Sequence, residues 1–153
     1  MTADPPARSH PDKAAADEAR APKPRARPNL AGCRVLVVED EYFIAEDLRT
    51  TLERCGAAVV GPAPDLATGL ALARREGAAL TAAVVDINLH GELAGYEIAG
   101  ELNRLGVPFV YASGYEAESV PPALQGAAHF VKPVRIEEVV RAVGRLCRRA
   151  PHG

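Results

Sequence analysis

Residues 34–41 have the sequence Arg-Val-Leu-Val-Val-Glu-Asp-Glu, a run of mostly β-branched apolar residues that ends in three carboxylates. A near-continuous apolar run of this length is typical of a strand that is buried on both faces, as the strands of parallel sheets are. The three acidic residues follow at the point where such a strand would end. This stretch therefore predicts an α/β fold with charged side chains at the carboxyl end of one buried strand.

The chain beyond residue 41 alternates between helical patterns and short apolar runs. Ile44, Leu48 and Leu52 share one face of the first predicted helix, and Asp65 is placed to cap the second. Because a right-handed crossover lays each helix across the sheet, five βα units predict a flavodoxin-like (βα)5 fold, a doubly wound sheet of five parallel strands. Strands are predicted at residues 34–38, 57–61, 82–86, 107–111 and 127–131, and helices at 42–55, 65–76, 96–105 and 135–148, with a weaker helix around Pro121-Pro122.

The first 32 residues differ in composition from the rest, since they are rich in alanine, proline and charge and have almost no large apolar residue. Such a segment buries too little surface to offset its conformational entropy. We therefore predict a disordered tail at residues 1–32 that offers no core residue, and one domain at residues 33–150. The basic end of this tail, Lys23-Pro-Arg-Ala-Arg-Pro28, is interpreted as solvated linker, and a docking or nucleic-acid patch stays open as the alternative.

The charge of the whole chain is nearly balanced, with 20 Asp and Glu against 18 Lys and Arg. No strong field therefore favours nucleic acid or membrane, and we expect no direct DNA binding. No apolar run approaches the roughly 18 residues of a transmembrane helix, and the first residues do not form a secretory signal. The scattered cysteines Cys33, Cys55 and Cys147 fit neither a disulfide framework nor a zinc cluster. We therefore expect a cytoplasmic protein.

Polar residues follow four of the predicted strands. In a doubly wound sheet the carboxyl ends of the strands form one edge, where ligands bind near the point at which the strand order reverses. Carboxylate oxygens suit Mg²⁺, and a lysine ammonium suits a phosphoryl oxygen. The sequence therefore predicts a site for a hard cation and a phosphoryl group, formed by Glu39-Asp40-Glu41, Asp86, Ser113-Gly114 and Lys132-Pro133.

Each of these residues also has an ordinary explanation. Asp40 alone would more simply cap the helix that begins at Tyr42, and a serine before a glycine, such as Ser113, is a common loop residue. The order in which the residues occur, each at a successive strand end, favours the site over these separate explanations.

Three segments resemble the receiver domains of two-component response regulators: Val35-Leu-Val-Val-Glu-Asp-Glu41, Val84-Val-Asp-Ile-Asn-Leu89 and Phe130-Val-Lys-Pro133. The resemblance covers residues 33–148. It implies a signalling switch that assists its own phosphorylation and dephosphorylation, and not an enzyme that acts on a metabolite. It also implies Mg²⁺ as cofactor, a sensor histidine kinase or a phosphotransfer protein as the phosphoryl donor, and a downstream protein target that the sequence does not identify. Dimerisation stays open.

The resemblance implies a role for each matching residue. Asp86 is expected to accept the phosphoryl group, with Lys132 and Ser113 in contact with it. A cis peptide is expected at Lys132-Pro133, because proline lowers the free-energy cost of that isomer. The metal site is implied to consist of Asp40 and Asp86 as direct ligands, Glu39 through a water molecule and Asn88 through its backbone carbonyl.

Two features of the sequence bear on the expected switch. His129 stands three positions before Lys132, where the family commonly has an aromatic residue. Residues 108–115, Pro-Phe-Val-Tyr-Ala-Ser-Gly-Tyr, are similar to the Phe-Ala-Thr-Gly-Tyr segment of single-domain receivers from alphaproteobacteria. That subgroup is associated with HWE-type kinases and stress signalling, so a stand-alone receiver is implied. The switch is expected to involve Ser113, Gly114, Tyr115 and His129, with Tyr115 or Tyr111 reporting phosphorylation.

Functions of other classes stay open at this point. A phosphatase or phosphotransferase of the haloacid-dehalogenase type also uses an aspartate after a strand together with Mg²⁺. That family has Asp-x-Asp at its nucleophile, whereas this chain has Asp86-Ile-Asn88. A flavodoxin-like cofactor binder, or a pseudo-receiver that is never phosphorylated, would share the fold. No glycine-rich phosphate loop follows the first strand, and the acidic site is complete, which disfavours both.

Overall fold

The computed structural model describes residues 2–3, 26–114, 121, 124 and 126–149. Tyr115, most of the predicted tail and most of the predicted helix around Pro121-Pro122 lie outside the described residues. None of the helices in these ranges has the length and apolar character that crossing a membrane requires. The elements are β1 (Arg34–Val38), α2 (Tyr42–Arg54), β2 (Ala58–Ala63), α3 (Leu66–Glu76), a 3-10 turn (Gly77–Ala79), β3 (Ala82–Val85), α4 (Gly95–Arg104), β4 (Phe109–Ser113), β5 (His129–Val131) and α5 (Ile136–Arg149).

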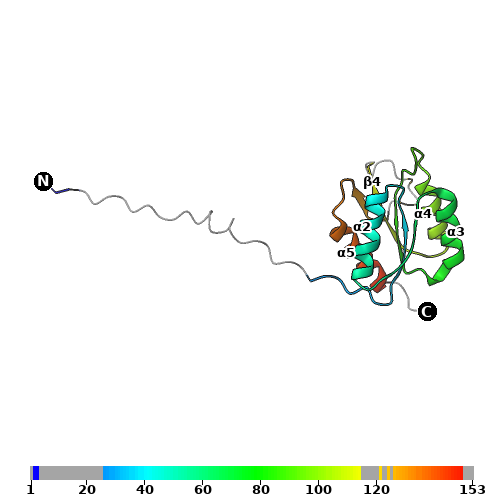
Figure 1. Ribbon diagram of the computed structural model, residues 1–153, viewed down its shortest axis with the longest axis horizontal. Helices are drawn as coiled ribbons and strands as arrows, with labels where there is room; N and C mark the ends of the chain where they lie inside the picture. Colours follow the sequence, from blue (N-terminus) through cyan, green and yellow to red (C-terminus); the bar gives the residue numbers. More distant parts are fainter. Residues whose placement is uncertain (1, 4–25, 115–120, 122–123, 125, 150–153) are drawn as a thin grey trace.

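All five strands form one parallel sheet in the order β2-β1-β3-β4-β5. Helices α2 and α5 cover one face of this sheet, and α3 and α4 cover the other (Figure 1). The chain moves from β1 outward to β2, and then crosses back over β1 to β3. The strand order therefore reverses between β1 and β3, which is where ligands bind in sheets of this kind. The predicted flavodoxin-like fold is confirmed.

Strand β1 is apolar throughout because both faces of the sheet are covered. Alternate residues of a strand point to opposite faces, so Val35 and Val37 lie in the core under α2 and α5, while Leu36 and Val38 lie in the core under α3 and α4. All four side chains are fully buried. The central strands β3 and β4 are likewise buried at every position. Burial on both faces, together with the parallel pairing of β1 and β3, therefore holds the carboxyl ends of these two strands side by side.

Several strand boundaries differ from the sequence-based prediction. Strand β5 begins at His129 and not at residue 127, and the other differences of two residues are at β2 and β4. Strand β2 does not end at Gly61 but continues through Pro62 to Ala63, with a cis peptide between Gly61 and Pro62. Proline is tolerated there because β2 lies at the edge of the sheet. Strand β4 begins at Phe109 and not at residue 107, because the N–H of Val107 donates to Leu102 O at the end of α4 over 2.9 Å.

The expectation that residues 1–32 contribute nothing to the core is wrong for Leu30. Its side chain is 0% exposed and lies in the core under α2 and α5. Its N–H donates to Cys55 O over 2.7 Å, and Arg141 donates to Ala26 O over 3.2 Å. One isolated leucine in a proline-rich segment has no periodicity that would reveal burial. The folded domain therefore includes residues 26–32.

The three cysteines have free thiols and are buried. Cys147 lies on the buried face of α5, as its place on the apolar stripe predicts. Burial, followed by the neighbouring Cys147 thiol, raises the pKa of Cys33 to about 12. A thiol that stays protonated is a poor nucleophile, so Cys33 is a core residue and not a reactive thiol.

Candidate functional site

Asp86 follows the last residue of β3 and is 2% exposed. Its own N–H donates to Val38 O over 2.9 Å, which continues the pairing of β1 with β3. Its carboxylate accepts two hydrogen bonds, one from the backbone N–H of Asn88 at 3.0 Å and one from Lys132 Nζ at 3.0 Å. The central sheet therefore fixes the carboxylate at the point where the strand order reverses.

Three carboxylates meet at this point. One oxygen each from Glu39, Asp40 and Asp86 lies within 4.8 Å of the other two. Glu39 is almost fully buried, and its Oε2 has no hydrogen-bond partner among the described residues. A buried carboxylate oxygen without a donor is costly, and a divalent cation held by oxygen ligands would satisfy it. The donor set therefore fits Mg²⁺, which prefers a few carboxylates and several waters.

Asp40 does not cap the helix that follows it. Helix α2 begins at Tyr42 after Glu41, and no side chain caps its first turn. Instead Asp40 Oδ2 accepts a hydrogen bond from the backbone N–H of His90 over 2.9 Å. His90 reaches this position with a φ of 53°, in the left-handed region that non-glycine residues rarely adopt. The helix-cap interpretation of Asp40 is wrong, and the carboxylate faces the loop after β3.

Lys132 directly follows the edge strand β5 and brings a positive charge to the same point. Its Nζ lies 2.9 Å from Glu39 Oε1 and 3.0 Å from Asp86 Oδ2. The backbone positions it, because its N–H donates to Ser113 O over 2.8 Å and its peptide bond to Pro133 is cis, as predicted. Burial by itself lowers the pKa of Lys132, but the hydrogen bonds and charges of the two carboxylates outweigh it and raise that pKa.

The two buried carboxylates resist ionisation. Burial raises the pKa of Glu39 to about 7; the Lys132 hydrogen bond opposes the shift, and the charge of Asp86 adds to it. Burial also raises the pKa of Asp86, against the hydrogen bond and charge of Lys132. One ammonium is too little positive charge for the three acidic groups that gather here. An added cation would therefore favour the ionised form of Asp86, which is the nucleophilic form.

Gly95 is part of the site, although the sequence gives no obvious sign of it. It is the first residue of α4, and its N–H donates to Ile87 O over 2.9 Å. A Cβ at this position would collide with the backbone oxygen of Asp86 and would lie 2.5 Å from Ile87 Cα. Only glycine lets α4 approach the chain at Asp86 this closely. The sequence contains only a weak signal for this role of Gly95, which is that a glycine directly precedes the predicted helix at residues 96–105.

The expected switch residues fall partly within the described chain. Ser113 is buried at the end of β4, and Gly114 beside it is exposed. His129 begins β5, is partly buried, and contacts Tyr111 edge to face with the ring centroids 6.1 Å apart. Tyr111 itself is fully buried. The expected role of Tyr115 concerns a residue outside the described ranges.

No protein-family model matches the sequence, and no curated protein matches it. Solved structures do match. The response regulator PhyR from Brucella abortus has a TM-score of 0.66 and 23% identity over 78% of this chain, and the match spans 49% of that protein's length. A CheY-like response regulator receiver domain protein from Methanospirillum hungatei has a TM-score of 0.66 and 26% identity, over 77% of this chain and 95% of its own.

A third similar structure contains bound Mg²⁺ and BeF. The response regulator TrrA from Thermotoga maritima, in complex with Mg²⁺ and BeF, has a TM-score of 0.62 and 23% identity, over 74% of this chain and 98% of its own. The chain therefore has the fold of response-regulator receiver domains, and the resemblance seen in its motifs is confirmed.

Proposed function

We propose that this chain is a phosphorylation-dependent signalling receiver that accepts a phosphoryl group on Asp86 in a reaction that requires Mg²⁺. The observation that supports this most directly is the placement of the buried Asp86 carboxylate between Lys132 and the acidic pair Glu39 and Asp40. The phosphoryl donor is a sensor histidine kinase or a phosphotransfer protein, and the segment around Ser113 favours a kinase of the HWE type. The setting is the cytoplasm. The output is phosphorylation-dependent binding to a protein or relay of the phosphoryl group to a further protein, without direct contact with DNA.

The chemistry follows from the positions of the charged groups. An oxygen of Asp86 attacks the phosphorus, the phosphorus–nitrogen bond to the donor histidine breaks, and the phosphoryl group ends on Asp86 as an acyl phosphate. Asp40, Asp86 and the Asn88 carbonyl would hold Mg²⁺ directly and Glu39 would hold it through water, and the bound ion would supply positive charge to the phosphoryl oxygens. Lys132 is within hydrogen-bond distance of Asp86 Oδ2 and is placed to move from that oxygen to a phosphoryl oxygen.

The readout of phosphorylation passes through β4. Ser113 is buried at the carboxyl end of the strand next to β3, so its hydroxyl is the natural donor to a phosphoryl group on Asp86. Gly114 gives the backbone freedom to follow. His129 and Tyr115 are the two further residues of this switch, with His129 in the place of the usual aromatic ring.

The test is phosphorylation by a small-molecule donor. The full-length protein is incubated with Mg²⁺ and acetyl phosphate, and its intact mass is measured. We expect one added phosphoryl group in the wild type, none in Asp86→Asn and none when EDTA removes Mg²⁺. Asp47→Asn is the matched control, since Asp47 is an exposed carboxylate on α2. Phosphate that still adds to Asp86→Asn would place the acceptor elsewhere.

A further inference from the structure

A pocket of about 470 Å³ lies at the end of the sheet opposite Asp86. It opens where β4 begins, because β5 pairs with β4 only from Tyr111 onward and leaves Phe109 and Val110 without a neighbouring strand on that side. Its volume is in the range of pockets that bind small organic ligands. Its lining comes from the end of α4, the start of β4, the residues just before β5 and the last turns of α5.

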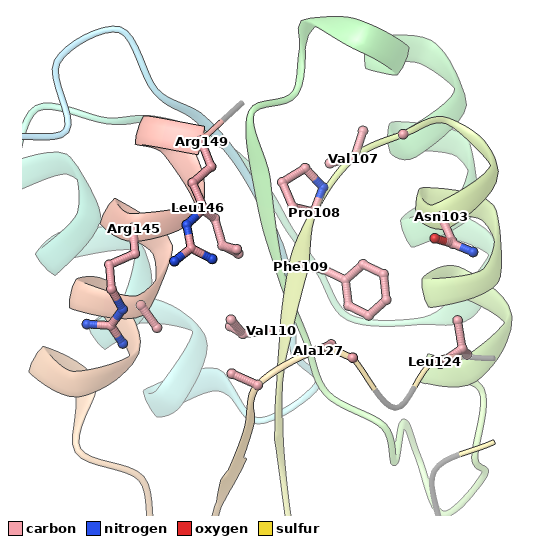
Figure 2. A pocket seen from close by; sticks show the side chains of 14 residues that line it. Asn103, Val107, Pro108, Phe109, Val110, Leu124, Ala127, Arg145, Leu146 and Arg149 are labelled. Carbon is pink, nitrogen blue, oxygen red and sulfur yellow. The ribbon is translucent and has the colours of Figure 1, made fainter. Parts of the chain in front are cut away.

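The walls of this pocket are chemically distinct. Figure 2 shows Arg145, Leu146 and Arg149 of α5 on one side, with Phe109 and Asn103 on the other. Between them lie Pro108, Val110 and Ala127 in the same view. The lining therefore combines apolar and polar surface, and its charged side chains come from the wall that α5 forms.

The charge of the pocket is positive and is not neutralised by the described protein. Arg145 and Arg149 lie one helical turn apart and are both exposed. Neither forms an ion pair with a described carboxylate, and none of the lining residues is acidic. Four arginines of the other helices differ, since each is paired with a glutamate: Arg49, Arg74, Arg75 and Arg104. Arg54 at the end of α2 has no such pair among the described residues.

We propose that this pocket binds an organic anion in which a carboxylate or phosphate head is attached to a compact apolar body. The planar guanidinium groups of Arg145 and Arg149 match the oxygens of such a head. The apolar surface of Pro108, Ala127 and Leu146, which are partly exposed, takes the body, which gains free energy on leaving water. The site is separate from Asp86, since β4 runs from Phe109 at the pocket to Ser113 beside the acidic cluster.

The experiment titrates the full-length protein, without Mg²⁺, with four probes followed by calorimetry and by amide NMR shifts. 1-Naphthoate and 1-naphthyl phosphate carry both the head and the body, 1-naphthamide lacks the charge, and acetate lacks the body. We expect saturable binding of the first two, with shifts at residues 107–110 and 145–149, and little binding of the others. The ratio of the first two affinities identifies the head group. No saturable binding, equal binding of the amide, or shifts confined to the residues around Asp86 would each overturn the proposal.

Two variants separate the charge from the shape. Arg145→Gln with Arg149→Gln should weaken 1-naphthoate by about tenfold or more, because charge-assisted hydrogen bonds are lost, and should leave weak amide binding unchanged. Arg74→Gln with Arg75→Gln removes the same charge from α3 and should change nothing. Ala128 is an exposed lining residue, so Ala128→Leu should fill the pocket without changing the net charge of the protein. We expect it to abolish binding. If both double substitutions weakened 1-naphthoate binding equally, the arginines would act only through the net charge of the protein. That result would contradict the proposal.

Discussion

Lys132 Nζ donates to Asp86 Oδ2 over 3.0 Å, although the two residues follow strands β5 and β3, which β4 separates in the sheet. The same ammonium also holds Glu39 at 2.9 Å. One cation thus compensates two buried carboxylates, and the sheet order forces this arrangement. The stability of the protein and the reactivity of its acceptor therefore depend on the same contact.

Lys132→Ala should destabilise the protein strongly in the absence of Mg²⁺. Removing one partner of a buried ion pair leaves uncompensated charge and typically costs about 3–5 kcal/mol. Because the acidic ligands remain, Mg²⁺ should still bind and should recover part of this loss. Urea unfolding at pH 8 with and without Mg²⁺ measures both effects. The control is Arg135→Ala, an exposed arginine that precedes α5. A Lys132→Ala protein as stable as the control would show that the pair does not hold the carboxylates.

Gly95→Ala should impair both folding and phosphorylation. The methyl group would meet the backbone of Asp86 and Ile87, which cannot give way as a flexible side chain can, so we expect a loss of roughly 1–3 kcal/mol. Displacing the Asp86 backbone should also slow phosphorylation by acetyl phosphate. Gly100→Ala is the matched control on the same helix, because nothing lies within 4 Å of its Cβ. It should stabilise α4 by about 0.5–1 kcal/mol. Equal effects of the two substitutions would remove Gly95 from the site.

Leu30→Ala should lower the free energy of unfolding by about 2–5 kcal/mol, as truncation of a fully buried leucine does. Leu93→Ala is the control for the same truncation, since that side chain is 49% exposed, and it should change stability by less than about 0.5 kcal/mol. Denaturant unfolding of both variants provides the comparison. A deletion of residues 1–30 should be as harmful as Leu30→Ala, and a harmless deletion would contradict the packing of Leu30.

The sequence predicts those parts of the fold and site that depend on local pattern. The apolar run that ends at Val38 marks a buried strand, and the order of Glu39, Asp86 and Lys132 at successive strand ends predicts that they meet, because parallel strands share one edge. Predicting that these three residues meet does not require any knowledge of side-chain packing. It requires only that the strands be parallel and that the order reverse between β1 and β3.

The features that the sequence does not predict depend on contacts between distant segments. The close approach of Gly95 to Asp86 depends on how α4 sits on the sheet. The hydrogen bond from His90 to Asp40 depends on the path of the loop after β3, and it replaces the local helix cap that propensity favours. Leu30 is buried only because it fills the space under α2 and α5. Tertiary packing decides each of these.

His129 should contribute a loss of stability in mild acid, opposite in sign to the contribution of the buried acids Glu39 and Asp86. Burial lowers the pKa of this imidazole, and neither ring nitrogen has a hydrogen-bond partner among the described residues. The unfolded chain therefore takes up a proton near the ordinary histidine pKa of about 6.5, while the folded protein resists it. The stabilisation is fully present above that pKa and is lost as the pH falls below it.

The comparison of wild type with His129→Phe isolates this effect. Phenylalanine keeps the edge-to-face contact with Tyr111 and removes both unpartnered nitrogens. We expect His129→Phe to be at least as stable as wild type at pH 7.5, and the stability difference between the two proteins to widen as the pH is lowered to 5.5. Glu39 and the other acids titrate in both proteins, so their contributions cancel in the difference. Urea unfolding at several pH values measures it, and parallel stability curves would mean that His129 takes up its proton equally well in the folded state.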